Sequence, residues 1–214
     1  MNHCSSPENQ ALTHSRLVVW VAAIAAISFA LPQLVRAERI PAPLVPTNIQ
    51  APAGHRAFLE GHAVGTQNYI CLTSGSGFAW TLFGPQATLF NDGFQQVITH
   101  FLSGNPLEGG TPRATWQHSR DTSSVWAAAI ASSSDPHFVV PGAIPWLLLQ
   151  VFGTQDGPTG GHRLTRTTFV QRVNTSGGVM PATGCTLSAD LGKKVLVPYT
   201  ADYFFYKDIN DDDN

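Results

Sequence analysis

From about residue 55 to residue 206, short segments of alternating apolar and polar residues are separated by Gly, Pro, Ser and Asn. Period-two alternation places successive side chains on opposite faces of a β-strand. The separating residues are those that turns favour, and helical periodicity is sparse. The pattern therefore predicts an all-β fold, namely a single-domain antiparallel β-sandwich or barrel of about 8–10 short strands.

The positions of most strands follow from this pattern. Ser124–Ala131 contains helix formers and suits a strand or a short helix equally well. Ser103–Arg113 is rich in Gly and Pro and is expected to be a surface loop of the kind that often carries function on β scaffolds. We expect strands at Gly65–Leu72, Phe78–Phe83, Phe94–Phe101, Ala114–His118, Pro145–Phe152, Thr165–Val173 and Val197–Tyr206.

The last of these segments carries aromatic residues on both faces. Tyr203 and Phe205 share one face, whereas Phe204 and Tyr206 share the other. A strand of this kind is expected at the centre of the fold, packed on both sides. Asp202 would then be at least partly buried and would need a partner. We expect a structural ion pair between Arg172 and Asp202. The alternatives are an ion pair of Asp202 with Arg166, hydrogen bonds of Asp202 within a turn, and a catalytic role for its carboxylate.

The N-terminus has the pattern of a secretory signal. Arg16 precedes an apolar run from Leu17 to Leu31, and small residues lead to a cleavage site near Ala37. The alternative is a membrane anchor, but the run is shorter than the roughly 20 residues that span a bilayer. We expect a secreted or periplasmic protein with no transmembrane segment in its mature form. The expected divisions are the signal (1–37), a Pro-rich lead-in (38–54), the β domain (55–206) and an acidic tail (207–214).

Charge and cysteine content narrow the classes of protein. The chain has 12 Lys+Arg against 14 Asp+Glu and no basic stripe, which argues against a nucleic-acid partner. Cys4 belongs to the signal, so Cys71 and Cys185 remain as an even pair in an oxidising compartment. One disulfide is expected, worth up to about 4–5 kcal/mol in the chain-entropy model; two buried free thiols are the alternative.

Four motifs together resemble those of the DUF3455 family of exported bacterial and fungal domains. They are "GTQNYIC" from Gly65, "AIPWLLL" from Ala143, "FVQRVNTSGGVMPATGC" from Phe169 and "VPYTADYFFY" from Val197. The resemblance covers roughly residues 41–206. It implies an exported all-β domain in which two cysteines match Cys71 and Cys185. The activity of the family is uncharacterised, so the resemblance supplies no catalytic residues.

One part of the family pattern is altered in this chain. The family tends to have a histidine, then "GPTW", then "DGS" and a valine. His100, Trp116 and Asp121 match this order, but Arg113-Ala114 replaces the Gly-Pro and Thr122 replaces the Gly of "DGS". These replacements leave the geometry of the loop open.

The candidate chemistry centres on this same region. His100, His118 and Asp121 would form a His/Asp set suited to a divalent metal or to acid–base chemistry if they converge within about 4–6 Å. Trp116 lies beside the variable loop and is expected to be exposed, as a platform for sugar rings or other flat ligands. These four residues are the candidate ligand-facing set.

Other chemistries lack support. There is no "GxSxG" or "HExxH" motif. The "SGSG" at Ser74–Gly77 is a hairpin turn, and "DINDDDN" lacks the glycine and glutamate of a calcium loop. The leading hypothesis is a non-enzymatic binding or envelope-associated module for a carbohydrate or small apolar ligand, with no cofactor. The alternatives are a metal-assisted or His/Asp enzyme at the four residues, and a structural surface protein.

Overall fold

The computed structural model describes residues 40–212, and the predicted signal, with Cys4, lies outside these residues. Eight strands account for the described fold, and its only helical segments are 3-10 turns. None of the described helices is long and apolar enough to cross a membrane. The strands are β1 (His55–Ser74), β2 (Gly77–Phe90), β3 (Gln96–Asn105), β4 (Thr111–His118), β5 (Ser124–Ser133), β6 (Trp146–Gln155), β7 (Phe169–Gly177) and β8 (Lys194–Asp208).

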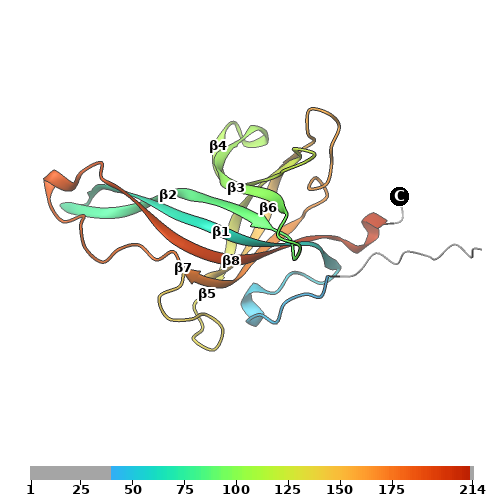
Figure 1. Cartoon of the computed structure of the whole chain (residues 1–214), viewed down its shortest axis with the longest axis horizontal. Coiled ribbons are helices and arrows are strands. Elements are labelled where there is room, and N and C mark those ends of the chain that lie inside the picture. Colours follow the sequence, from blue (N-terminus) through green and yellow to red (C-terminus); the bar gives the residue numbers. More distant parts are fainter. Residues whose placement is uncertain (1–39, 213–214) are drawn as a thin grey trace, which may run out of the picture. The chain divides into compact units, whose positions relative to one another are not determined.

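The eight strands close into an antiparallel barrel (Figure 1). Each strand pairs with the next along the chain, and β8 returns to pair with β1. Closure leaves the barrel without a free sheet edge. The predicted all-β class is confirmed, and the barrel is the architecture that the chain adopts. The ambiguous segment from Ser124 forms β5.

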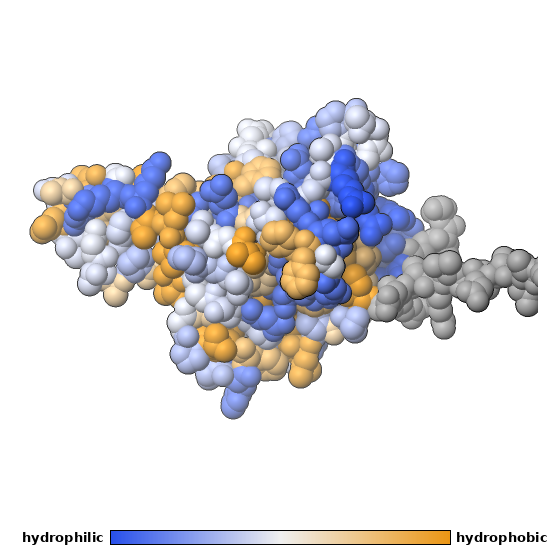
Figure 2. Space-filling view, in the orientation of Figure 1, coloured by the Kyte–Doolittle hydropathy of each residue, from blue (hydrophilic) through white to orange (hydrophobic). Residues whose placement is uncertain are grey.

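A three-stranded ribbon projects from the barrel. β2 pairs with β3 only from Ala87 to Phe90, whereas its pairing with β1 continues to Gly77. The distal half of this hairpin and the start of β8 therefore extend past the barrel wall (Figure 1). Figure 2 shows apolar surface on this ribbon. The predicted disulfide is confirmed here: buried Cys71 in β1 is bonded to buried Cys185 in the loop before β8, with Cα atoms 5.5 Å apart.

Both faces of β8 are packed, as its aromatic pattern predicts. Tyr203 and Phe205 point into the barrel and join its main core. Phe204 and Tyr206 point outward and are covered by the lead-in segment, whose Ile49 is fully buried against them. Gln171 fixes this contact, because its Nε2 donates a hydrogen bond of 2.6 Å to the Ile49 carbonyl and its Oε1 accepts one from the Tyr206 hydroxyl.

Several expected boundaries need correction. The expected loop at Ser103–Arg113 is mostly strand, with only a short 3-10 turn (Pro106–Glu108) between β3 and β4. Phe94 is not in a strand: it occupies the β2–β3 turn with φ 55° and is 88% exposed. Residues 165–168 precede β7, because Thr167 closes a turn onto the Leu164 carbonyl.

Candidate functional site

A cavity of about 280 Å³ lies inside the barrel, and all eight strands contribute to its lining. Eight-stranded barrels have interiors just wide enough to be filled by side chains or to hold one small ligand. Here β5 supplies Ala127 and Ala129, whose methyl groups leave space that larger side chains would fill. Leu147 and Leu149 of β6 continue this apolar wall. The volume is close to the lower end of small-molecule sites, about 300–1,000 Å³.

A stack of aromatic rings forms one side of the cavity. The His100 and Trp116 rings are nearly parallel, 8° apart, with centroids separated by 4.3 Å. Tyr203 meets the Trp116 ring edge-on at 5.6 Å. The expectation that Trp116 is exposed is wrong, because its exposed fraction is 0%. The strand register explains this burial. Trp116 in β4 is the direct cross-strand partner of His100 in β3, and both side chains are buried in the interior.

His100 is held neutral in this stack. Its Nδ1 lies 2.8 Å from the Thr115 carbonyl oxygen, which can only accept, so Nδ1 carries the proton and Nε2 is the acceptor. Burial lowers the pKa of His100 to about 3, against the opposing effect of this hydrogen bond. A neutral imidazole of this kind is a structural and recognition group at ordinary pH.

Three buried N–H groups on the lining of the cavity have no hydrogen-bond partner in the described protein. They belong to Gln67 Nε2, Trp116 Nε1 and Arg172 Nε, none of which makes a hydrogen bond of good geometry. The Gln67 and Arg172 side chains do lie close to the Tyr199 and Tyr203 hydroxyls and oppose the rise in pKa that burial causes there. A buried polar group without a partner costs about 1–3 kcal/mol. Three such donors from three strands around one cavity are the arrangement expected for a site that binds a hydrogen-bond acceptor.

Two arginines line the cavity, and Arg113 is ion-paired with Glu108, so Arg172 is the one whose charge is not neutralised by a carboxylate. Its Nη2 donates a hydrogen bond of 2.8 Å to the Pro145 carbonyl, and none of the ion pairs among the described residues includes it. Burial raises the pKa of Tyr203, and the nearby guanidinium opposes that rise. The Tyr203 hydroxyl lies 3.2 Å from the hydroxyl of Tyr199. A half-buried cation beside neutral hydroxyls favours an anionic ligand.

The predicted Arg172–Asp202 ion pair is not formed. In the β7–β8 register Arg172 lies opposite Tyr203, whereas Asp202 lies opposite Val173. Because neighbouring residues of a strand alternate in direction, Arg172 faces the cavity and Asp202 faces the outside. Asp202 instead contacts His62 Nδ1 at 2.7 Å and accepts a hydrogen bond from Asn174 Nδ2 at 2.8 Å.

The four candidate residues form two separate pairs. His100 and Trp116 line the cavity, whereas His118 and Asp121 line a different hollow of about 480 Å³, beside the β2–β3 and β4–β5 turns. His118 Nδ1 is 3.0 Å from Asp121 Oδ1. Burial lowers the pKa of His118, against the attraction of Asp121. The convergence that the acid–base hypothesis requires is therefore not achieved by the set as a whole.

Asp121 has a structural task in this hollow. Its Oδ1 accepts hydrogen bonds from the Ser123 N–H at 3.0 Å and the Ser123 hydroxyl at 2.7 Å. Its Oδ2 accepts one from the Arg163 N–H at 2.7 Å. The carboxylate thus joins the β4–β5 turn to the loop before β7. Both of its oxygens are occupied, which leaves little capacity for acid–base chemistry.

Gln67 and Arg172 line the cavity, a position that the sequence motifs alone do not predict for them. The alternation in "FVQRV" does place Arg172 on the same face as Val170, and Val170 is fully buried in the barrel core. A positively charged residue on the buried face of a strand is therefore a sequence feature that indicates an interior polar site. The small residues at 127–129 were a second signal, because they indicate space beside their strand.

The fold and cavity define a class: an eight-stranded up-and-down antiparallel barrel with a ligand-sized interior and a disulfide-bonded ribbon. The family model described as "Protein of unknown function (DUF3455)" matches residues 52–207, and the chain belongs to this family. The matched region begins before β1 and ends one residue before the end of β8, so it includes the barrel except for Asp208. Comparisons with curated proteins and with solved structures give no match.

Proposed function

We propose that this protein is a binding module that holds a small organic anion with a flat, apolar body inside its barrel. The observation that carries this proposal is the set of three unpartnered buried donors, from Gln67, Trp116 and Arg172, on the lining of one cavity. A carboxylate or similar acceptor placed among them would satisfy groups that otherwise cost free energy.

The rest of the lining indicates the body of the ligand. Ala127, Ala129, Leu147 and Leu149 also line the cavity, and their side chains offer no hydrogen bonds. A sugar presents hydroxyl groups around its ring and would leave several of them unpaired against these side chains. The faces of His100 and Trp116 are already stacked on each other. Of the two ligand classes expected from sequence, the small apolar ligand therefore has the better support.

We further propose that this binding takes place outside the cytoplasm, in the periplasm or after secretion. The Cys71–Cys185 disulfide supports this, because such bonds persist mainly in oxidising compartments. The signal pattern ending near Ala37 supports it independently.

Two probes of similar shape and different charge test the proposal. 2-Naphthoate is a flat apolar anion, and 2-naphthol is its neutral counterpart; both can be titrated calorimetrically into the purified protein. We expect 2-naphthoate to bind the parent protein more tightly. In Arg172→Gln its affinity should fall at least tenfold, about 1.4 kcal/mol, with little change for 2-naphthol.

Arg120→Gln is the matched control, because Arg120 lines the other hollow rather than the cavity. It should bind 2-naphthoate as the parent does. Ala129→Leu is the second test variant. Because the larger side chain occupies space in the cavity, this variant should bind neither 2-naphthoate nor 2-naphthol. Equal affinity of the parent for both probes, or unchanged binding in Ala129→Leu, would overturn the proposal.

A further inference from the structure

A second cluster of side chains, on the outside of the barrel, has the composition of a metal site. Glu60 and His62 are two residues apart in β1, so they lie on the same face of the strand. Asp202 in β8 is the direct cross-strand partner of His62. One potential ligand atom from each residue lies within 4.8 Å of the other two.

We propose that Glu60, His62 and Asp202 form a divalent-metal site across the seam where β1 and β8 close the barrel. One imidazole and two carboxylates suit Zn²⁺, Mn²⁺ or Fe²⁺. At metal–ligand distances of about 2.0–2.2 Å, a tetrahedral ion needs its ligand atoms about 3.4 Å apart.

The contacts of His62 indicate a position for the ion. Its Nδ1 lies 2.7 Å from Asp202 Oδ1, and its Nε2 lies 3.0 Å from Asp92 Oδ1 in the β2–β3 turn. Each ring nitrogen therefore faces a carboxylate oxygen. A divalent ion bound between His62 and Asp202 would take the place that a proton holds there now.

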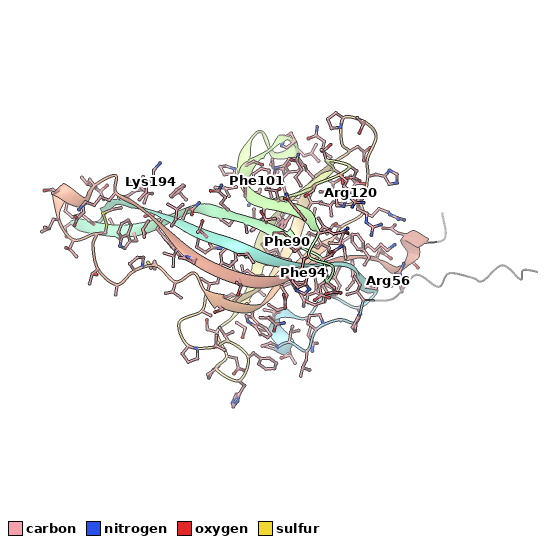
Figure 3. The ribbon with its side chains drawn as sticks, viewed as in Figure 1. Arg56, Phe90, Phe94, Phe101, Arg120 and Lys194 are labelled. Carbon is pink, nitrogen blue, oxygen red and sulfur yellow. A yellow bond between two sulfur atoms is a disulfide. The ribbon has the colours of Figure 1, made fainter. Side chains whose placement is uncertain are left out.

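The balance of charge at the cluster also favours a cation. The charged groups that act on the Glu60 carboxyl are His62, Asp202 and Asp92. Three carboxylates thus lie around one imidazole, while Arg120 and Arg163 line the same hollow but are not among the groups that act on Glu60. Because the His62 side chain is 41% exposed and that of Asp202 is 23% exposed, an ion has access from solvent and keeps room for bound water. In Figure 3, Phe90, Phe94 and Arg120 mark this end of the barrel, and Lys194 marks the distant ribbon.

Asn174 orients the aspartate of the proposed site. Its side-chain Nδ2 donates to Asp202 Oδ2 at 2.8 Å, which leaves Oδ1 directed at His62. Asn174 lies at a bulge in β7 and has a φ of 50°. Hydrogen bonds that hold a ligating carboxylate in place are a regular feature of metal sites and affect affinity about 10–100-fold.

This site differs from the metal set considered from sequence. His100 and His118 are not direct partners across β3 and β4, because His100 pairs with Trp116 and His118 with Ile98. They line different hollows, and it is His118 that shares its hollow with Glu60 and His62 of the proposed site.

Metal titration of the full purified protein, stripped with a chelator, tests the inference. We expect one Zn²⁺ per chain by isothermal calorimetry, and a visible spectrum with Co²⁺. His62→Gln and Asp202→Asn should each weaken Zn²⁺ binding tenfold or more, and Asn174→Ala should weaken it less. His137→Gln is the matched control, because His137 is an exposed histidine outside the cluster.

The outcomes separate this inference from the proposed function. Arg172→Gln should retain Zn²⁺ binding in full, since Arg172 faces the cavity and not the seam. Absence of Zn²⁺ binding by the parent below about 1 mM, or equal binding by His62→Gln and the parent, would overturn the inference. A loss in His137→Gln that matches the loss in His62→Gln would also overturn it, since it would indicate adventitious surface binding.

Discussion

Arg172 and Asp202 lie on neighbouring strands one register position apart, yet they face opposite sides of the barrel wall. The guanidinium lines the interior cavity, and the carboxylate joins a cluster on the outer surface. On the same face of the wall the two groups would form an ion pair. The barrel wall instead separates them, with the positive charge of Arg172 inside and the negative charge of Asp202 outside. This division is the physical basis of the proposals that the cavity binds an anion and the seam a cation.

Replacement of Arg172 by Met should stabilise the ligand-free protein. The change removes a half-buried charge that has no ion-pair partner and fills the same space with apolar atoms. We expect the free energy of unfolding to rise by about 1 kcal/mol, measured by chemical denaturation. Arg166→Met is the control and should change it little, because Arg166 is outside the cavity. A large loss of stability in Arg172→Met would show that the guanidinium is needed for folding rather than for binding.

Stability should fall in mild acid because of His100. Burial lowers the pKa of His100 to about 3, whereas in the unfolded chain it titrates near 6.5. Between these values the unfolded state binds more protons, so the free energy of unfolding decreases as pH falls below about 6.5. One group can contribute at most about 1.4 kcal/mol per pH unit.

His100→Gln should make the dependence of the unfolding free energy on pH shallower between about pH 6.5 and pH 3. Urea denaturation at several pH values measures it. His137→Gln, on the surface, should leave the slope unchanged. An identical slope in the parent and in His100→Gln would mean that the buried imidazole does not control acid sensitivity.

Thr122→Gly should stabilise the β4–β5 turn. Thr122 has a φ of 59°, which is strained for a β-branched residue but free for glycine. The family pattern has glycine at this position. The change also removes the hydrogen bond from the Thr122 hydroxyl to the Asp121 carbonyl. With this loss included, we expect the free energy of unfolding to rise by about 0.5–1 kcal/mol.

Thr122→Ala separates the two effects, because it removes the hydroxyl and keeps the backbone strain. It should be less stable than the parent protein, as measured by thermal unfolding. If Thr122→Gly is no more stable than Thr122→Ala, the backbone argument is wrong.

Removal of the disulfide should loosen the ribbon more than the barrel. The Cys71–Cys185 bond closes a separation of 114 residues, and the double change to Ala should lower the free energy of unfolding by up to about 4–5 kcal/mol in the chain-entropy model. Hydrogen exchange should rise first at the Cys71 and Gly192 amides, which bond the Lys193 and Cys71 carbonyls. Because the lower global stability speeds exchange everywhere, the contradicting result is exchange at these two amides that rises no more than it does at the barrel amides.

The sequence contains enough to predict the strands but not the way they close. Alternation identifies the two faces of the last strand, and both are packed as predicted. The expectation that Trp116 is exposed comes from its position beside the predicted loop, and that segment is largely strand, with Trp116 directed into the barrel. Ser124–Ala131 has the composition of a helix and becomes β5 because it pairs with β4 and β6.

The candidate site depends on contacts that local patterns do not encode. His62 meets Asp202 only because β8 returns to pair with β1 across 140 residues. The three unpartnered donors likewise come from three strands that are brought together by closure. Such relationships follow from register, and register between distant strands is a property of the whole barrel.

The indole N–H signals of the tryptophans test the central claim most directly. Trp116 and Trp146 both have a buried Nε1 without a partner, but only Trp116 lines the cavity. On titration with 2-naphthoate, proton–nitrogen NMR should show the Trp116 indole resonance moving downfield as it gains an acceptor, while that of Trp146 stays in place. A Trp116 resonance that does not move at saturation, or one that moves no more than that of Trp146, would contradict binding inside the barrel.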